Sequence, residues 1–132
     1  MKLWSLAAAG CLALTAFAGI TVADAEPPPP CSFTLSTPEV VQVDGATMVT
    51  ATLGPAACGF PAGPSLSIAC LQLQGVDTGG TCTQAHGSDP AQIYVPYRQG
   101  GTYASSGRGC PSWAGQSPAQ WCQILGPYTA TL

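Results

Sequence analysis

The chain has 132 residues and a formal net charge of -3, and only 7% of its residues are charged, against about 25% in an average soluble domain. Three Lys and Arg residues in total cannot build a basic face that neutralises phosphates, so the composition argues against nucleic-acid binding. The length is that of a single domain.

The N-terminal segment has the layout of a secretory signal peptide. Lys2 supplies a positive charge, residues 3–23 are uncharged, and Ala23-Asp24-Ala25 has the small-x-small pattern of a cleavage site. We therefore expect a signal peptide over residues 1–25 and a mature chain that begins at Glu26.

Two other fates of this segment remain open. Its 21 uncharged residues are long enough to be retained as a bilayer anchor, and Cys11 follows a lipobox-like Ala8-Ala9-Gly10. With cleavage, no membrane span remains, and we expect a protein that is secreted or held in the cell envelope. Residues 26–30 then form a proline-rich spacer, in which Pro27–Pro30 is a stiff stretch of about 12 Å, before a single β-sandwich domain over residues 31–132.

Beyond the spacer, the mature chain has little apolar material to bury. Leu, Ile, Val and Phe make up 18 of its 107 residues, and Gly plus Pro make up 27. This composition is at the border where a chain fails to bury enough apolar surface. Six cysteines compensate, because an even number of cysteines in a small exported chain indicates disulfide bonds. No C-x-x-C pair is present and His86 is the only histidine, so we expect no metal site.

The spacing of the cysteines predicts their pairing. Cys70 and Cys82 lie 12 residues apart, symmetric about the turn-like stretch 75–80, and the last two cysteines have the same spacing around the stretch 114–118. Two hairpins there would place the members of each pair opposite one another, which leaves the first two cysteines for each other. Each closed loop would contribute about 3 kcal/mol. The expected bridges are Cys31–Cys58, Cys70–Cys82 and Cys110–Cys122.

The rest of the chain has the pattern of β-strands, because short runs rich in Val, Thr, Ile and Tyr alternate with Gly and Pro clusters. Asp44-Gly45 is a turn signal, Pro96 limits its run to an edge strand, and a one-residue phase change after Cys70 suggests a bulge or a crossing between sheets. No helical period is visible. The sequence predicts an all-β, disulfide-stapled, immunoglobulin-like β-sandwich of about seven to nine short strands. The strand-like runs are 32–36, 40–44, 47–53, 65–74, 91–97, 101–105, 120–125 and 128–132.

Residue types that could carry catalysis are scarce. His86-Gly87-Ser88-Asp89 holds the residue types of a hydrolase triad, but neighbours in a turn splay apart, so this motif is expected to be a loop. A two-carboxylate site is not forbidden, because such pairs form in space. No G-x-S-x-G and no phosphate-binding glycine motif is present. We expect neither enzyme activity nor a cofactor.

The residues most suited to binding surround Cys110. Arg108 is flanked by glycines, which predicts an arginine on a flexible loop held in place by the adjacent cystine. Trp113 and Trp121 flank the expected Cys110–Cys122 bridge. Arginine and tryptophan are enriched in binding hot spots, so we expect these three side chains to contact a partner. A solvated arginine and tryptophans that pack on the core or the cystine are the plain alternatives.

The layout of the chain resembles that of known exported proteins. A signal, a proline spacer and a strand-forming chain poor in Lys and rich in Ala, Gly, Thr and Pro resemble small cysteine-containing exported proteins of high-GC Gram-positive bacteria. The profile is also similar to that of the neocarzinostatin-like apoproteins. That resemblance implies an acidic immunoglobulin-like sandwich that carries an apolar chromophore. Six cysteines depart from the usual four of that family, and no binding residue is carried over.

Two functions are expected on these grounds. The first is an exported, non-catalytic binding module that contacts a protein or a component of the cell envelope. The alternative is a carrier of a small apolar ligand in a cleft of the sandwich. A cavity lined by aromatic side chains would favour the carrier, whereas a closed core with an aromatic surface patch would favour the binding module.

Overall fold

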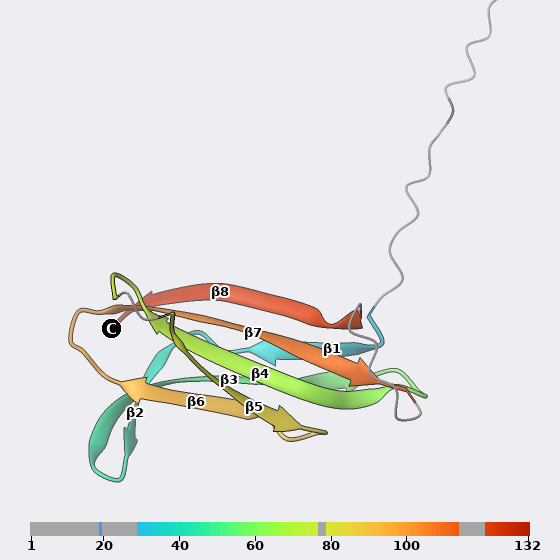
Figure 1. Cartoon of the computed structure of the whole chain (residues 1–132), viewed down its shortest axis with the longest axis horizontal. Helices are drawn as coiled ribbons and strands as arrows, with labels where there is room; N and C mark the ends of the chain where they lie inside the picture. Colours follow the sequence, from blue (N-terminus) through green and yellow to red (C-terminus); the bar gives the residue numbers. More distant parts are fainter. Residues whose placement is uncertain (1–18, 20–28, 77–78, 114–120) are drawn as a thin grey trace, which may run out of the picture.

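The chain forms a β-sandwich of two antiparallel sheets in a computed structural model that describes residues 19, 29–76, 79–113 and 121–132 (Figure 1). The predicted signal segment, apart from Gly19, and the stretch 114–118 lie outside the described residues. The all-β class and a strand number between seven and nine are confirmed. The eight strands are β1 (Cys31–Leu35), β2 (Glu39–Val43), β3 (Ala46–Cys58), β4 (Gly63–Leu73), β5 (Thr81–His86), β6 (Ala91–Pro96), β7 (Thr102–Ser112) and β8 (Gln123–Thr131).

One sheet, which we call the β3 sheet, is built around its longest strand. β6 pairs with one edge of β3, while β1 and β2 pair with successive parts of the opposite edge. β1 and β2 are thus two halves of one broken edge strand. Ser36 bridges the break, because its N–H donates to the Thr52 carbonyl at 3.0 Å and its Oγ accepts from the Thr52 N–H at 2.8 Å.

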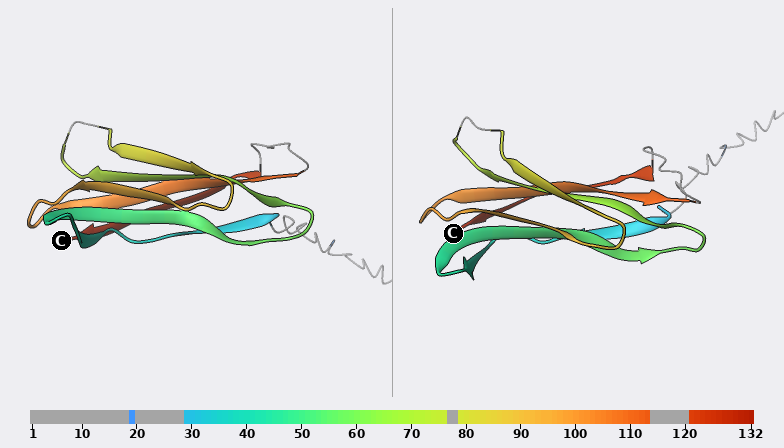
Figure 2. Two further views of the ribbon diagram at one scale, coloured as in Figure 1. Left: turned by 90° about the horizontal axis from the view of Figure 1, so that it is seen from below. Right: turned by 60° about the horizontal axis from the view of Figure 1, so that its bottom comes forward.

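The other sheet, the β4 sheet, has the strand order β5-β4-β7-β8. The chain passes from one sheet to the other between β3 and β4, between β5 and β6, and between β6 and β7. Figure 2 shows the two sheets stacked face to face. Asp44 and Gly45 join β2 to β3 with φ values of 51° and 82°, as a two-residue hairpin turn requires, which confirms the turn signal.

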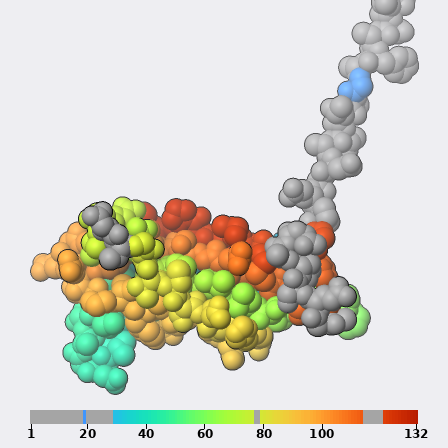
Figure 3. Space-filling model, in the orientation of Figure 1, coloured from blue at the N-terminus to red at the C-terminus, as the bar shows by residue number. Residues whose placement is uncertain are grey.

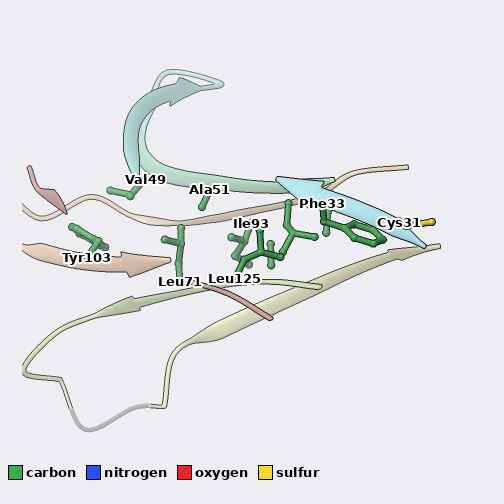
Figure 4. Packing of buried hydrophobic residues seen from close by; sticks show 11 residues of the cluster. Cys31, Phe33, Val49, Ala51, Leu71, Ile93, Tyr103 and Leu125 are labelled. Atoms are coloured by element: carbon green, nitrogen blue, oxygen red, sulfur yellow. The ribbon is translucent and has the colours of Figure 1, made fainter. Parts of the chain in front are cut away.

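The core lies between the sheets and is built from small and medium side chains. Tyr103 and Leu53 are the largest side chains that are fully buried, and Phe33 is 4% exposed. Figure 4 shows the labelled side chains converging between the ribbons. The buried cluster consists of Cys31, Phe33, Val49, Ala51, Leu53, Ala69, Leu71, Ala91, Ile93, Tyr103 and Leu125.

Three disulfides join neighbouring strands, and they are the pairs that the spacing predicts. Cys31 on β1 is bonded to Cys58 on β3, Cys70 on β4 to Cys82 on β5, and Cys110 on β7 to Cys122 just before β8, with Cα–Cα distances of 4.0, 4.0 and 4.1 Å. Disulfides persist in oxidising compartments. The three bridges therefore indicate an oxidising environment for the folded chain.

The structure differs from the predicted strands in four places, one of which is the run expected at 47–53, which continues as β3 to Cys58. β5, with the sequence TCTQAH, is absent from the expected runs, because its polar side chains leave no clear alternation of apolar and polar residues in the sequence. The run expected at 101–105 continues as β7 to Ser112. The last two expected runs are one strand, β8, in which the register shifts between Ser105 and Gly107 of its partner. Glycines inside strands account for the shortened predictions, since they read as turn signals.

The predicted irregularity after Cys70 is wrong. β4 pairs with β5 and β7 without a shift from Leu66 onward, and its register shift lies between Pro64 and Leu66. Ala69 and Leu71 are buried in the core, whereas Ile68 and Cys70 alternate with them on the outer face. The apolar pattern changes phase in the sequence because both faces of β4 carry apolar side chains. The edge position predicted from Pro96 is confirmed, since β6 pairs only with β3 among the described strands.

Candidate functional site

Arg108 lies in the middle of β7, and the prediction of a loop is wrong. Its backbone is paired with Ile68 of β4 on one side and with Ile124 of β8 on the other. Residues directly opposite one another in antiparallel strands share a face of the sheet. The three side chains therefore form a row across the β4 sheet.

The two glycines beside Arg108 mark close packing of the sheets. A Cβ at Gly107 would overlap the Ile68 carbonyl and the Leu53 side chain, and a Cβ at Gly109 would overlap the ring of Phe33. Both positions therefore face the core. Because side chains alternate along a strand, Arg108 faces outward, and it is exposed.

We call the outer surface around this row the Arg108 face. Leu66 on β4 lies opposite Cys110 on β7, which extends the row toward the Cys110–Cys122 disulfide. Ile124 is 72% exposed. Figure 3 shows the β4 sheet as a broad surface from β8 in red to β5 in yellow. The Arg108 face consists of Leu66, Ile68, Arg108, Ile124 and the Cys110–Cys122 bridge.

Trp113 and Trp121 pack against each other beside the Cys110–Cys122 bridge. Their ring centroids are 5.8 Å apart and their planes meet at 88°, an edge-to-face arrangement. Both side chains are half-buried. Trp113 is five positions beyond Arg108, which is about 16 Å along a strand. The structure thus brings the two tryptophans together and places Arg108 farther along the same strand.

Sequence reasoning missed the neighbours that Arg108 has on its face. Ile68 and Ile124 become its neighbours only through the register of three strands, and none of them is near the others in the chain. The alternation Ser105-Ser106-Gly107-Arg108-Gly109-Cys110 was the available signal. Read with a period of two, it places Arg108 and Cys110 on one face and the glycines on the other.

A shallow cavity of about 190 Å³ lies at the opposite end of the β4 sheet. Its only aromatic side chain is Tyr103, and the Tyr103 hydroxyl is already engaged. It donates to the Pro96 carbonyl at 3.0 Å and accepts from the Arg98 N–H at 2.8 Å. The lining consists of Leu71, Leu73, Val76, Gly80, Thr81, Val95, Pro96, Arg98 and Tyr103.

The residue types of the hydrolase motif lie in the turn after β5. The Asp89 N–H donates to the His86 carbonyl at 3.4 Å, so the chain reverses there. In the part of the chain that the structure describes, the His86 side chain has no hydrogen bond or ion pair, and no group of three or more His, Cys, Asp or Glu residues is arranged to hold a metal ion. None of the same residues form a helix with the length and apolar character to cross a bilayer.

No family model, curated protein or solved structure was found to match the chain.

Proposed function

We propose that the protein is an exported, non-catalytic binding module whose Arg108 face contacts a protein or another component of the cell envelope or extracellular space. The observation that carries this proposal is the row in which exposed Arg108 lies between Ile68 and the 72% exposed Ile124. An arginine within an apolar surface is the composition found at the centre of protein interfaces. The Trp113–Trp121 pair would extend the contact past the disulfide.

We also propose that the sandwich is of the immunoglobulin-like type. The strand orders, the crossings between sheets and a buried tyrosine support it. Tyr103 lies at the start of β7, just after the corner that follows β6, and its hydroxyl bonds back to the backbone of that corner. Immunoglobulin-like domains have a tyrosine at this corner with the same bond. Such sandwiches present binding surfaces on a rigid scaffold, as the Arg108 face would.

Export is supported by the disulfides together with the predicted signal peptide. The three bridges need an oxidising compartment, and residues 1–25 have the layout of a cleaved leader. N-terminal sequencing of the protein from its producing cells should find Glu26. A chain that starts at Met1, or a lipidated Cys11, would make the protein membrane-anchored instead.

The alternative function, a carrier of a small apolar ligand, has weaker support. Ligand sites usually enclose about 300–1,000 Å³ and are lined by several aromatic side chains. The cavity near Tyr103 is smaller, at about 190 Å³, and has one aromatic residue. The half-buried Trp113–Trp121 pair is the aromatic surface feature that supports the binding module. We also propose that the protein is not an enzyme, because its sequence has a single histidine and no G-x-S-x-G motif.

The proposed contact can be tested by cross-linking in the producing cells. A photo-activated side chain at position 124 should capture a partner, and the same group at position 94 serves as the control, because Tyr94 is on the β3 sheet and is 39% exposed. With the captured partner, Arg108→Ala should weaken binding by about 1–2 kcal/mol. It should change the free energy of unfolding by less than about 0.5 kcal/mol.

Equal capture at positions 124 and 94, or unchanged affinity of the Arg108→Ala, Trp113→Ala and Trp121→Ala variants, would place the contact elsewhere. Hydrolytic turnover that His86→Ala abolishes would overturn the non-catalytic proposal.

A further inference from the structure

We propose that one end of the sandwich rests on the surface of a lipid bilayer, with Phe60 as its inserted tip. This goes beyond the proposed function, because it concerns another class of partner and an end of the sandwich that shares only the Cys110–Cys122 bridge and the two tryptophans with the proposed contact. We call this surface the uncharged end; it comprises residues 29–33, 55–64, 110–113 and 121–123, which include no Asp, Glu, Lys, Arg or His.

These segments meet at one end because of the strand register. Cys31 is paired with Cys58, and Gly63 is paired with Ser112, so the start of β1, the β3–β4 turn and the end of β7 lie together. Figure 2 shows the β3–β4 turn at the same end of the sandwich as the start of β1. The β5–β6 connection, which carries Asp89, borders this end: the Gly87 N–H donates to the Ser65 carbonyl at 2.8 Å, and Pro90 lies against Gly54.

Aromatic side chains project at this end. Phe60, in the turn between β3 and β4, is 100% exposed, the highest value among the exposed large hydrophobic residues. Trp113 and Trp121 are half-buried at the neighbouring strand ends, so each keeps part of its ring at the surface. Tryptophan and other aromatic rings concentrate where membrane proteins meet the headgroup region. A fully exposed phenylalanine costs free energy in water, which burial among acyl chains would recover.

The polar groups of this end are largely engaged within the protein. The Gly59 N–H donates to the Pro30 carbonyl at 2.8 Å, and the Ala62 N–H donates to the Gly59 carbonyl at 2.9 Å. Gln123 Oε1 accepts from the Phe33 N–H at 2.8 Å. Prolines remove further N–H donors, since they have none. These three N–H groups therefore keep their partners in a medium without water. The prolines of this end are Pro29, Pro30, Pro55, Pro61, Pro64 and Pro111.

The path of the chain agrees with a bilayer at this end. β1 starts there, so the residues just before Cys31 join the domain beside the β3–β4 turn (Figure 1). Residues 3–23 are an uncharged run of bilayer-spanning length, and the spacer that follows reaches only about 12 Å. A retained run would hold the uncharged end against the membrane. A cleaved chain would depend on Phe60 and the tryptophans for the contact.

A lipid surface fits this end better than a protein partner does. Protein interfaces have a polar, partly charged rim around an apolar centre, and this end has no charged residue in its segments. The same absence predicts which lipids are bound. Without Lys or Arg there is no attraction to anionic headgroups, so zwitterionic vesicles should bind as well as anionic ones.

The test uses the full chain from its producing cells, carrying Trp4→Phe so that only Trp113 and Trp121 emit. Phosphatidylcholine vesicles should shift their emission to the blue, and brominated acyl chains should quench it. Phe60→Ser should lower the partition coefficient about tenfold. Ile124→Ser, which removes an exposed apolar side chain from the Arg108 face, should leave it within about twofold. A retained N-terminal segment would hold every variant on the vesicle and make the partition coefficients equal. In that case the readout is the quenching of tryptophan emission by brominated acyl chains, which Phe60→Ser should lose.

Equal partition and equal quenching of the Phe60→Ser and Ile124→Ser variants would overturn the proposal. So would binding that requires anionic lipid and disappears in about 0.5 M salt. A dimer that forms without vesicles and is lost in Phe60→Ser would assign this end to a second copy of the chain. Arg108→Ala should leave vesicle binding unchanged, which separates a failure here from a failure of the proposed partner contact.

Discussion

Gly109 on β7 lies against the ring of Phe33 on β1, so closely that a Cβ at position 109 would overlap the ring. The contact joins the two sheets at the residue that follows Arg108 in β7. It shows that the glycine next to Arg108 is needed for packing between the sheets and explains why the sequence there resembles a loop.

Gly109→Ala should therefore destabilise the fold. Forcing a methyl group into a packed core typically costs about 1–3 kcal/mol, and the Phe33 ring has to move to admit this one. Urea unfolding should show a lower midpoint. Gly63→Ala is the matched control. Gly63 is on β4, another strand of the same sheet, and a Cβ at this position would meet nothing within 4 Å. Equal stability of the two variants would contradict the packing argument.

Two buried serines should respond in opposite ways to alanine. Ser67 and Ser105 are both 0% exposed, but the Ser67 hydroxyl has no hydrogen-bond partner among the described residues, whereas Ser105 donates to the Ser36 carbonyl at 2.8 Å. Removing an unpaired buried hydroxyl relieves a desolvation cost, so Ser67→Ala should raise the free energy of unfolding by about 1 kcal/mol. Ser105→Ala should lower it by about 1–2 kcal/mol. A thermal melt of both variants checks the sign, and destabilisation by Ser67→Ala would show that a partner exists.

Tyr103→Phe should lower stability without changing the shape of the core. The hydroxyl bonds both Pro96 and Arg98 in the corner between β6 and β7, and its loss leaves those backbone groups unpaired at a cost of about 1–2 kcal/mol. Tyr94→Phe is the control, since Tyr94 is 39% exposed and its hydroxyl has no hydrogen bond to another described residue. If both changes had the same effect on the unfolding midpoint, the hydrogen bonds of the Tyr103 hydroxyl would not stabilise the corner between β6 and β7.

Reduction of the disulfides should unfold the domain. The core has few large side chains, and each bridge contributes about 3 kcal/mol by restricting the unfolded chain. Circular dichroism with and without reductant should show loss of the cooperative melt in the reduced protein. Free-thiol counting must confirm that all six cysteines are reduced. An unchanged melting curve would mean that the small core suffices.

The sequence by itself determined the class of the fold and the pairing of its disulfide bonds. Turn residues between short β-forming runs predict strands, and the symmetric spacing of Cys70 and Cys82 predicts a cross-strand bridge, because both are local properties of hairpins. The turn at Asp44-Gly45 and the edge position of Pro96 belong to the same group. Each depends on the backbone preferences of one or two residues.

Only the tertiary structure decided which residues form the Arg108 face and the uncharged end. Gly107 and Gly109 have the pattern of a loop until Leu53 and Phe33 from the opposite sheet are placed against them. The row of Ile68, Arg108 and Ile124, and the proximity of the Phe60 turn to the end of β7, come from pairings between strands far apart in the chain. Such neighbours are selected by the packing of two sheets around one core, and local preference carries no information about which distant strand will lie alongside.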